Sequence, residues 1–138
     1  MDVHELQVFL DAAFPGDLPY TVEEVFDTGV RLRLAVDESN VRPGGTVSGP
    51  SLMALADCAA WLAVVGQIGP VALAVTTSLH IDFLRKPALV DVVAVGTLLK
   101  LGTRLAVVDV VLHSVARDAL VAKAQVTYSI PPGQDPRV

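Results

Sequence analysis

The sequence predicts an α+β fold in which an antiparallel sheet of about six strands wraps around one central apolar helix. Three observations support this prediction. Residues 50–65 are apolar on almost every side of a helix, and four segments after them alternate apolar and polar residues as β-strands do. Short turns separate the last strands, which favours antiparallel pairing. A helix that is apolar all round needs a sheet that curls around it.

The elements before this helix are a surface helix and a hairpin. Apolar residues recur at spacings of three and four between residues 3 and 14, and a Pro-Gly pair ends this helix. Residues 20–26 and 30–36 read as two strands joined by an Asp-Thr-Gly turn. Residues 37–49 hold one proline and three glycines, so we expect a loop there.

The central helix is expected over residues 50–65. Pro50 suits its first turn, Gly66 marks its end, and Asp57 is its only charged residue. This order of elements is the layout of a hotdog fold. The alternative, an open α+β sandwich, would leave one face of the helix in water, which the composition of the helix opposes.

After the central helix the pattern changes to a period of two. In the first strand, Val75, Thr77 and Leu79 share one face, and Thr76, Ser78 and His80 share the other. His80 is therefore expected to be a surface histidine. The four strands of this half are predicted at residues 75–83, 91–101, 104–114 and 119–130.

Length and composition indicate one domain, residues 1–138, that assembles with copies of itself. Hydrophobic residues make up 52% of the chain and charged residues 18%, against about 25% charged residues in an average soluble domain. So little charge cannot cover the surface of a monomer evenly. We therefore expect a buried interface in a homodimer or homotetramer.

Charge and cysteine content exclude several classes of protein. The net charge is −5 and no basic run exceeds two residues, which argues against nucleic acid as a ligand. The lone Cys58 rules out an internal disulfide and any multi-cysteine zinc site, and the three histidines lack metal-ligand spacing. We expect no metal and no cofactor. The first residues do not resemble a secretory signal, so the expected location is the cytoplasm.

Residues 58–81 contain no Asp, Glu, Lys or Arg and are long enough in principle to cross a membrane. Glycines and a proline interrupt them at 66–70, and their longest unbroken apolar piece is residues 58–65. A membrane span needs about 20 apolar residues. We therefore expect a buried core segment and no membrane.

The entry to the central helix is the richest candidate site. A helix start presents unpaired N–H groups and a partial positive charge, which suit a developing oxyanion. Gly49 lets a ligand carbonyl approach its N–H closely, whereas Pro50 has no N–H. Asp57 lies about 12 Å farther along the helix axis, at about 1.5 Å per residue. Gly49 and Asp57 of one chain therefore cannot both contact one atom, although a partner chain could close the gap.

Asp57 has a functional and a structural interpretation. Burying an unpaired carboxylate costs several kcal/mol, which favours a functional role for Asp57. The alternative is a structural carboxylate that backbone, Ser or Thr donors satisfy at a subunit interface. Among its neighbours, Ser48 is expected to cap the helix, Cys58 to be a small buried hydrophobe, and Trp61 to pack in the core or an interface.

Two segments resemble one family, the phenylacetate-pathway type of hotdog acyl-CoA thioesterases. GTVSGPSLMALADCAAW resembles that family's G-x-x-H-G-G-x-x-x-x-L-x-D/E segment, and TTSLHIDFLRKP resembles its T-x-x-x-x-x-x-F-L-R-P strand. The resemblance runs from about Val30 to Ile130. It implies that Gly49 supplies the oxyanion N–H, Asp57 is the catalytic carboxylate and Thr76 is an auxiliary polar residue near the attacking water. In the family these residues come from two subunits.

The sequence departs from the family pattern at three positions. The family's histidine is Ser48 here, its second glycine is Pro50, and its Asn or Gln six residues before the histidine is Arg42. The first and third changes remove groups that orient the thioester and the leaving group. Arg42 is expected to contact an anionic acyl group or a coenzyme A (CoA) phosphate instead.

The leading hypothesis is therefore an acyl-CoA thioesterase. Asp57 either activates water as a general base or attacks as a nucleophile, and the sequence leaves both open. The alternative is a hotdog protein that binds acyl-CoA or another thioester without turnover. A hotdog hydratase or dehydratase would need a histidine near the helix entry, which this sequence lacks.

The remaining substrate contacts follow from charge and size. Arg85 and Lys86, with Arg104 as a further candidate, offer positive charge to the CoA phosphates, although strand-end residues are often simply solvated. Trp61, Met53 and Phe83 are expected to set the depth of the acyl pocket and, with it, the acyl preference.

Overall fold

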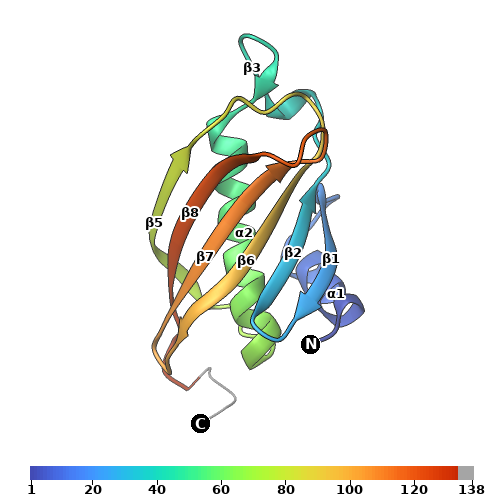
Figure 1. Cartoon of the computed structure of the whole chain (residues 1–138). Coiled ribbons are helices and arrows are strands. Elements are labelled where there is room, and N and C mark those ends of the chain that lie inside the picture. The colour runs from blue at the N-terminus through green and yellow to red at the C-terminus, as the bar shows by residue number, and fades with distance from the viewer. Residues whose placement is uncertain (134–138) are drawn as a thin grey trace.

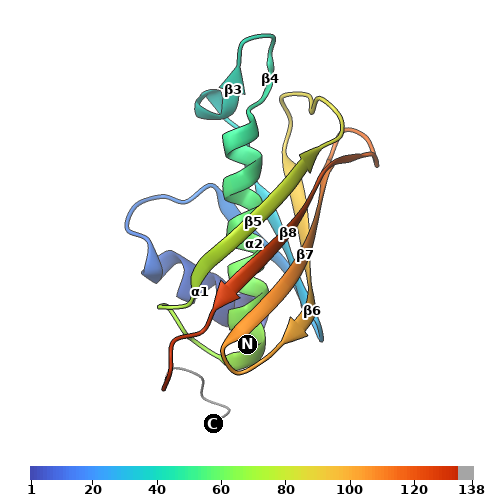
Figure 2. The same ribbon diagram turned by 90° about the vertical axis from the view of Figure 1, so that its left-hand side faces the viewer.

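A six-stranded antiparallel sheet wraps around helix α2 (Gly49–Ile68) in the computed structural model (Figures 1 and 2). The structure describes residues 1–133. The strand order is β1-β2-β6-β7-β8-β5, so β1 and β5 form the two edges of the sheet. This arrangement is the hotdog fold, and it confirms the fold class predicted from the sequence.

All six predicted strands are present in the large sheet. They are β1 (Tyr20–Phe26), β2 (Gly29–Leu34), β5 (Val75–Phe83), β6 (Val92–Leu101), β7 (Leu105–Ser114) and β8 (Leu120–Ser129). The predicted surface helix is α1 (Val3–Ala13), which buries Leu6 and Leu10.

The segment expected to be a loop, residues 37–49, has more structure than the sequence suggested. It holds a short 3-10 helix (Glu38–Asn40) and a small hairpin of β3 (Val41–Arg42) and β4 (Thr46–Val47). The turn between these strands has two glycines at positive φ. Strands of only two residues are too short to show an alternating pattern, so the sequence does not reveal this hairpin.

Helix α2 begins as predicted and ends later than predicted. Ser48 is its N-cap and Pro50 lies in its first turn. It continues through Gly66, which is buried against side chains of α1 and β2, and stops at Gly69, whose φ is +98°. The prediction that Gly66 ends the helix was therefore wrong, because the positive φ that ends the helix falls on Gly69. A Cβ at Gly66 would meet its nearest neighbour, the Leu6 side chain, at an ordinary contact distance of 3.8 Å.

The burial of α2 differs between its two halves. By length and composition it could cross a membrane, but 67% of its most apolar window is buried inside this fold, as in a core helix. The first half leaves one strip open, where Met53 and Ala54 are exposed and Asp57 and Cys58 are half-buried. The prediction of a fully enclosed helix was therefore wrong for this strip. The sequence does not reveal this exposed strip, because a helix that is apolar all round has no polar face to indicate which side meets water.

A β-bulge in β5 changes which residues face α2. Thr76 pairs with Tyr128 and Ser78 pairs with Thr127, so Thr77 is the extra residue. Thr76 and Leu79 consequently both face the helix, although strict alternation predicted opposite faces. The bulge depends on the pairing with β8, so the sequence of β5 alone does not show it.

The two edges of the sheet differ in how they are protected. The Gln7 side chain of α1 covers β1, accepting from the Val22 N–H at 2.7 Å and donating to the Tyr20 carbonyl at 3.2 Å. Strand β5 has no such cover within residues 1–133, and Val75 and Phe83 at its ends are 56% and 51% exposed. The β5 edge is therefore open to a further strand.

Candidate active site

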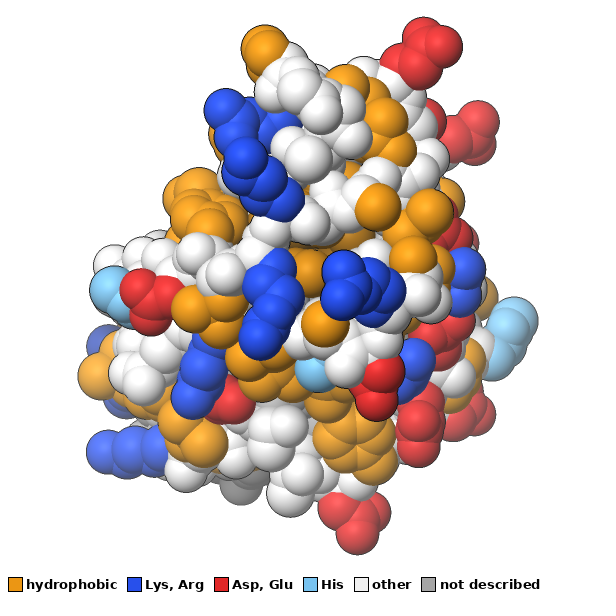
Figure 3. All heavy atoms as spheres, turned by 45° about the horizontal axis from the view of Figure 1, so that its top comes forward, with side chains coloured by type: hydrophobic (Ala, Val, Ile, Leu, Met, Phe, Trp, Pro, Cys, Tyr) orange, Lys and Arg blue, Asp and Glu red, His pale blue; other side chains and the backbone are white. Residues whose placement is uncertain are grey.

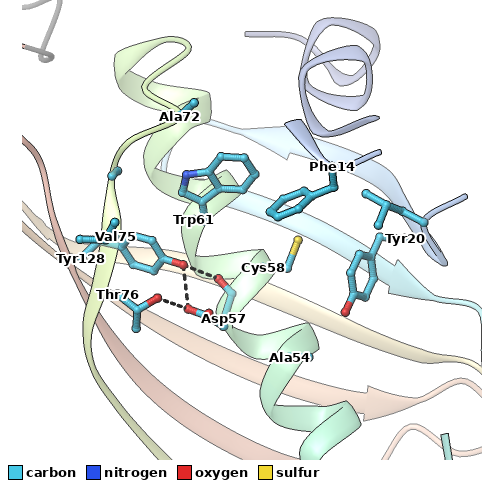
Figure 4. A pocket seen from close by; sticks show the side chains of 12 residues that line it. Phe14, Tyr20, Ala54, Asp57, Cys58, Trp61, Ala72, Val75, Thr76 and Tyr128 are labelled. Carbon is cyan, nitrogen blue, oxygen red and sulfur yellow. Dashed lines mark hydrogen bonds between the residues drawn. The ribbon is translucent and has the colours of Figure 1, made fainter. Parts of the chain in front are cut away.

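A cavity of about 540 Å³ lies beside the open strip of α2 (Figure 4). We call it the Asp57 cavity. Its walls are mainly apolar and aromatic, with Phe14, Leu18, Trp61 and Val75 among them. Its polar groups gather where α2, β5 and β8 meet, and this combination of apolar walls and a few convergent polar groups is typical of a small-molecule site.

Two hydroxyl groups hold one oxygen of the Asp57 carboxylate. Thr76 Oγ1 donates to Asp57 Oδ1 at 2.6 Å, and the Tyr128 hydroxyl donates to the same oxygen at 2.7 Å (Figure 4). Asp57 Oδ2 accepts no hydrogen bond from any residue in 1–133. The geometry therefore orients the carboxylate and leaves Oδ2 available to a water molecule or a substrate.

The other titratable groups of the cavity keep their protons at neutral pH. Burial raises the pKa of Tyr128 well above its usual range, and the Asp57 carboxylate adds to this effect. Burial, together with the Asp57 charge, raises the pKa of Cys58 to about 12. Burial also raises the pKa of Tyr20 to about 12. Tyr128 is thus a hydrogen-bond donor, and Cys58 is not a thiolate nucleophile.

A second hollow of about 400 Å³ lies at the start of α2, and we call it the Gly49 hollow. Arg42, Arg85 and Lys86 line it together with Gly49. The Phe83 ring lies over Gly49, where an added Cβ would be 3.4 Å from the ring. The Gly49 N–H belongs to the first turn of the helix, where N–H groups have no intrahelical acceptor.

Two other predicted residues of this region lie at the helix start. Ser48 caps the helix, as predicted: its Oγ accepts from the Ser51 N–H at 3.3 Å and donates to Ser51 Oγ at 2.9 Å. Pro50 is exposed and lines the Gly49 hollow. The Ser48 hydroxyl is therefore engaged within the chain.

The structure brings some predicted residues together and separates others. Asp57 and Thr76 share one cavity, whereas Gly49 lines the other hollow, in agreement with the distance of about 12 Å along the helix. Arg104 precedes β7 at the end of the sheet opposite Arg85, so it does not belong with the other cations. Among residues 1–133, no three His, Cys, Asp or Glu side chains gather as metal ligands would.

Trp61 packs in the core and also forms part of the cavity wall. It is 6% exposed, and its ring centroid lies 5.3 Å from that of Phe9 and 5.6 Å from that of Phe14. This agrees with the predicted packing role. Neither Phe14 nor the half-buried Tyr20 carried a sequence signal for the cavity, because both come from segments that only the fold brings to α2.

Tyr128 is a site residue that was not predicted from the sequence. It occupies an inward position of β8 and is 4% exposed. A buried tyrosine hydroxyl needs a hydrogen-bond partner, so an inward tyrosine among apolar residues was a usable signal. Its partner could not be named without the register between β8 and β5.

Comparisons with known proteins agree with this fold. The sequence profile of the thioesterase superfamily matches residues 44–120. A protein of Silicibacter sp. TM1040, described as a candidate thioesterase, is 43% identical, with 96% of this chain and 93% of that chain covered and a TM-score of 0.87. No curated protein matches the chain in sequence.

Two more distant structures share the fold. Zebrafish thioesterase superfamily member 2 is 20% identical, with 95% of this chain and 99% of that chain covered and a TM-score of 0.82. A hypothetical thioesterase of Streptococcus pneumoniae TIGR4, crystallised with coenzyme A, is 22% identical, with 94% and 96% covered and a TM-score of 0.73.

Proposed function

The chain belongs to the thioesterase superfamily, and from this we propose that it hydrolyses acyl-CoA thioesters with Asp57 as the reactive carboxylate. The observation that carries the proposal is the Asp57 carboxylate itself, held through Oδ1 and open at Oδ2, in a cavity with apolar walls. The CoA bound to the Streptococcus pneumoniae protein supports the substrate class. The two sequence motifs support the phenylacetate-pathway branch of the superfamily.

The reaction needs one negatively charged oxygen and one donor to the thioester carbonyl. As a general base, Asp57 Oδ2 takes a proton from water, the water oxygen attacks the carbonyl carbon, and the C–S bond breaks. The protonated Asp57 then gives its proton to the leaving sulfur, which releases the CoA thiol and the carboxylic acid. As a nucleophile, Oδ2 attacks the carbonyl carbon itself and the C–S bond breaks, so that the CoA thiolate leaves and a mixed anhydride forms. Water then hydrolyses this anhydride to the carboxylic acid and the Asp57 carboxylate, and the proton released protonates the CoA thiolate. In both routes Thr76 and Tyr128 hold Oδ1, and a backbone N–H stabilises the oxyanion.

The proposed oxyanion donor is Gly49 of the partner subunit. Within one chain Gly49 and Asp57 line different hollows, so one thioester cannot reach both. The open β5 edge, with exposed apolar residues at its ends, supports pairing with a second copy. Such a copy lies beside the open strip of α2, because Val75 and Thr76 of β5 border the same cavity as Asp57.

The two hollows suit different parts of an acyl-CoA. The apolar Asp57 cavity suits the acyl group, with Trp61 in its wall. The Gly49 hollow carries Arg42, Arg85 and Lys86, which suit the CoA phosphates. Binding one substrate therefore uses the cavity of one protomer and the hollow of its partner.

A second candidate function is thioester binding without turnover. It is favoured by Ser48, whose hydroxyl is engaged with Ser51 at the position where the family has a histidine, and by Pro50, which has no N–H. The two candidate functions differ in whether Asp57 takes part in a reaction or only stabilises the structure.

The test is a paired measurement on wild type and Asp57→Asn over a panel of acyl-CoAs, with free thiol and thermal midpoint as the readouts. Loss of a general base typically lowers turnover about 10²- to 10⁴-fold, and we expect a loss of that size with the fold retained. Thr76→Ser, which keeps a hydroxyl donor, serves as the mild control. A folded Asp57→Asn variant that keeps its rate within about threefold, far below that range, would make Asp57 structural and favour the binding protein.

A further inference from the structure

Two adjoining hollows lie at the end of the fold that carries the β3–β4 hairpin. One is the Gly49 hollow. The other, of about 120 Å³, lies between the segment after β5 and the β7–β8 hairpin, and we call it the Arg117 hollow. Arg85, Lys86 and Pro87 belong to the walls of both, so one extended ligand can reach from the first hollow to the second.

The charge around these hollows is not neutralised by the protein. Four cations border them: Arg42, Arg85, Lys86 and Arg117. No Asp or Glu lines either hollow, and none of the four cations has an ion pair within the described part of the chain. By contrast, both arginines of β2 are paired with carboxylates. Figure 3 shows Lys and Arg side chains across the middle of this face. On a chain of net charge −5, such a cluster is a local attractor for anions.

The two hollows differ in size and in what they can hold. The Arg117 hollow, of about 120 Å³, is less than a third the size of the Gly49 hollow, of about 400 Å³, so it suits a compact anion such as one phosphate group. Arg85 Nη1 donates to the Leu120 carbonyl at 2.7 Å, which fixes this guanidinium at the shared wall. The Arg117 N–H donates to the Ser114 carbonyl at 3.3 Å, which holds the turn that carries Arg117.

We propose that the Arg117 hollow binds the 3′-phosphate of coenzyme A, with Arg117 and Lys86 as its cationic contacts. Arg42 and Arg85 then lie nearer the pyrophosphate, and the Gly49 hollow holds the pantetheine arm. The inference rests on the proposed acyl-CoA function and narrows its substrate class. Thioesters of 3′-phosphorylated CoA are preferred over carrier-bound phosphopantetheine thioesters, which lack this phosphate.

The test is calorimetric titration of the protein with CoA and with 3′-dephospho-CoA. Wild type should bind CoA about three- to tenfold more tightly, as expected for charge-assisted hydrogen bonds at an exposed site. Arg117→Ala, which leaves Lys86 in place, should reduce this preference to less than about twofold, because one of the two cationic contacts is lost. Arg104→Ala removes an exposed arginine at the opposite end of the sheet and should keep the wild-type preference.

The outcomes separate this site from the proposed catalysis, because titration needs no turnover. Equal affinity of wild type for the two ligands, or no measurable binding of CoA, overturns the inference. An equal loss of affinity for both ligands in Arg117→Ala also overturns it. If wild type shows the CoA preference and Arg117→Ala loses most of it, the phosphate site is supported even when the protein does not hydrolyse acyl-CoA. In that case only the proposed catalysis fails.

Discussion

Replacing Tyr128 by Phe tests whether the hydrogen bonds to Asp57 Oδ1 position the carboxylate for reaction. The substitution keeps the buried ring and removes only the hydroxyl, which donates to Oδ1 at 2.7 Å. A hydrogen bond to a charged group contributes about 1.5 to 3 kcal/mol. At about 1.36 kcal/mol per decade, its full loss in the transition state corresponds to roughly 10- to 150-fold in rate.

We expect the lower end of this range because Thr76 still donates to the same oxygen at 2.6 Å. The kcat should fall about tenfold, while KM stays within about twofold because the lost hydroxyl contacts the oxygen that does not face the substrate. The fold should lose about 1 kcal/mol, equivalent to a few degrees in Tm for a chain of this size. Thr76→Val should act in the same direction, since it removes the other donor.

A double-mutant cycle with Asp57→Asn distinguishes a Tyr128 that positions the Asp57 carboxylate from a Tyr128 that only stabilises the fold. If Tyr128 acts through Asp57, adding Tyr128→Phe to Asp57→Asn should change the residual rate by less than about twofold. A merely structural tyrosine would lower the rate in both backgrounds. The reasoning is refuted by that second pattern, and also by a Tyr128→Phe enzyme that keeps the wild-type kcat.

Three further predictions follow from other parts of the molecule. Because burial raises the pKa of Cys58 from 9.0 to about 12, alkylation of this thiol at pH 8 should be about 10³-fold slower in the folded chain than in urea. The stability of the fold should also fall as the pH rises above 9, because only the unfolded chain then releases the Cys58 proton. Similar alkylation rates in both states would contradict the burial argument. Changing Arg42 to Asn and Ser48 to His together should raise turnover of simple acyl-CoAs; an unchanged rate with normal CoA binding would indicate a site adapted to a different thioester. Light scattering should show at least a dimer, and an active monomer of 14.5 kDa would rule out the two-chain site.

The sequence predicts the fold well because the pattern of α2 and of the strands is strong and local. A helix that is apolar all round leaves few architectures open, and each strand keeps its period of two over most of its length. The prediction failed at the end of α2, where two glycines lie three residues apart. Gly66 reads as a helix end, yet the helix continues to Ile68 and the positive φ that ends it falls on Gly69.

The candidate site is less predictable because its parts meet only through strand register. The sequence singles out Asp57 by its charge within an apolar helix. Thr76, however, is on the wrong face under strict alternation, and the bulge at Thr77 returns it to Asp57. Tyr128 reaches the same oxygen because it pairs directly with Thr76, and that pairing is a property of two strands, not of either one.

The open strip of α2 and the open edge of β5 have one physical explanation. Both border the Asp57 cavity, and both expose apolar groups, Met53 on the helix and Val75 on the strand. A chain with 18% charged residues has little charge with which to shield such a surface. A two-fold partner that pairs at β5 would cover the strand edge and the helix strip together and would bring its Gly49 toward this Asp57. The exposed apolar surface formed by the α2 strip and the β5 edge would then be the surface that completes the site. A variant that blocks pairing at β5 should therefore lose hydrolysis while keeping its fold.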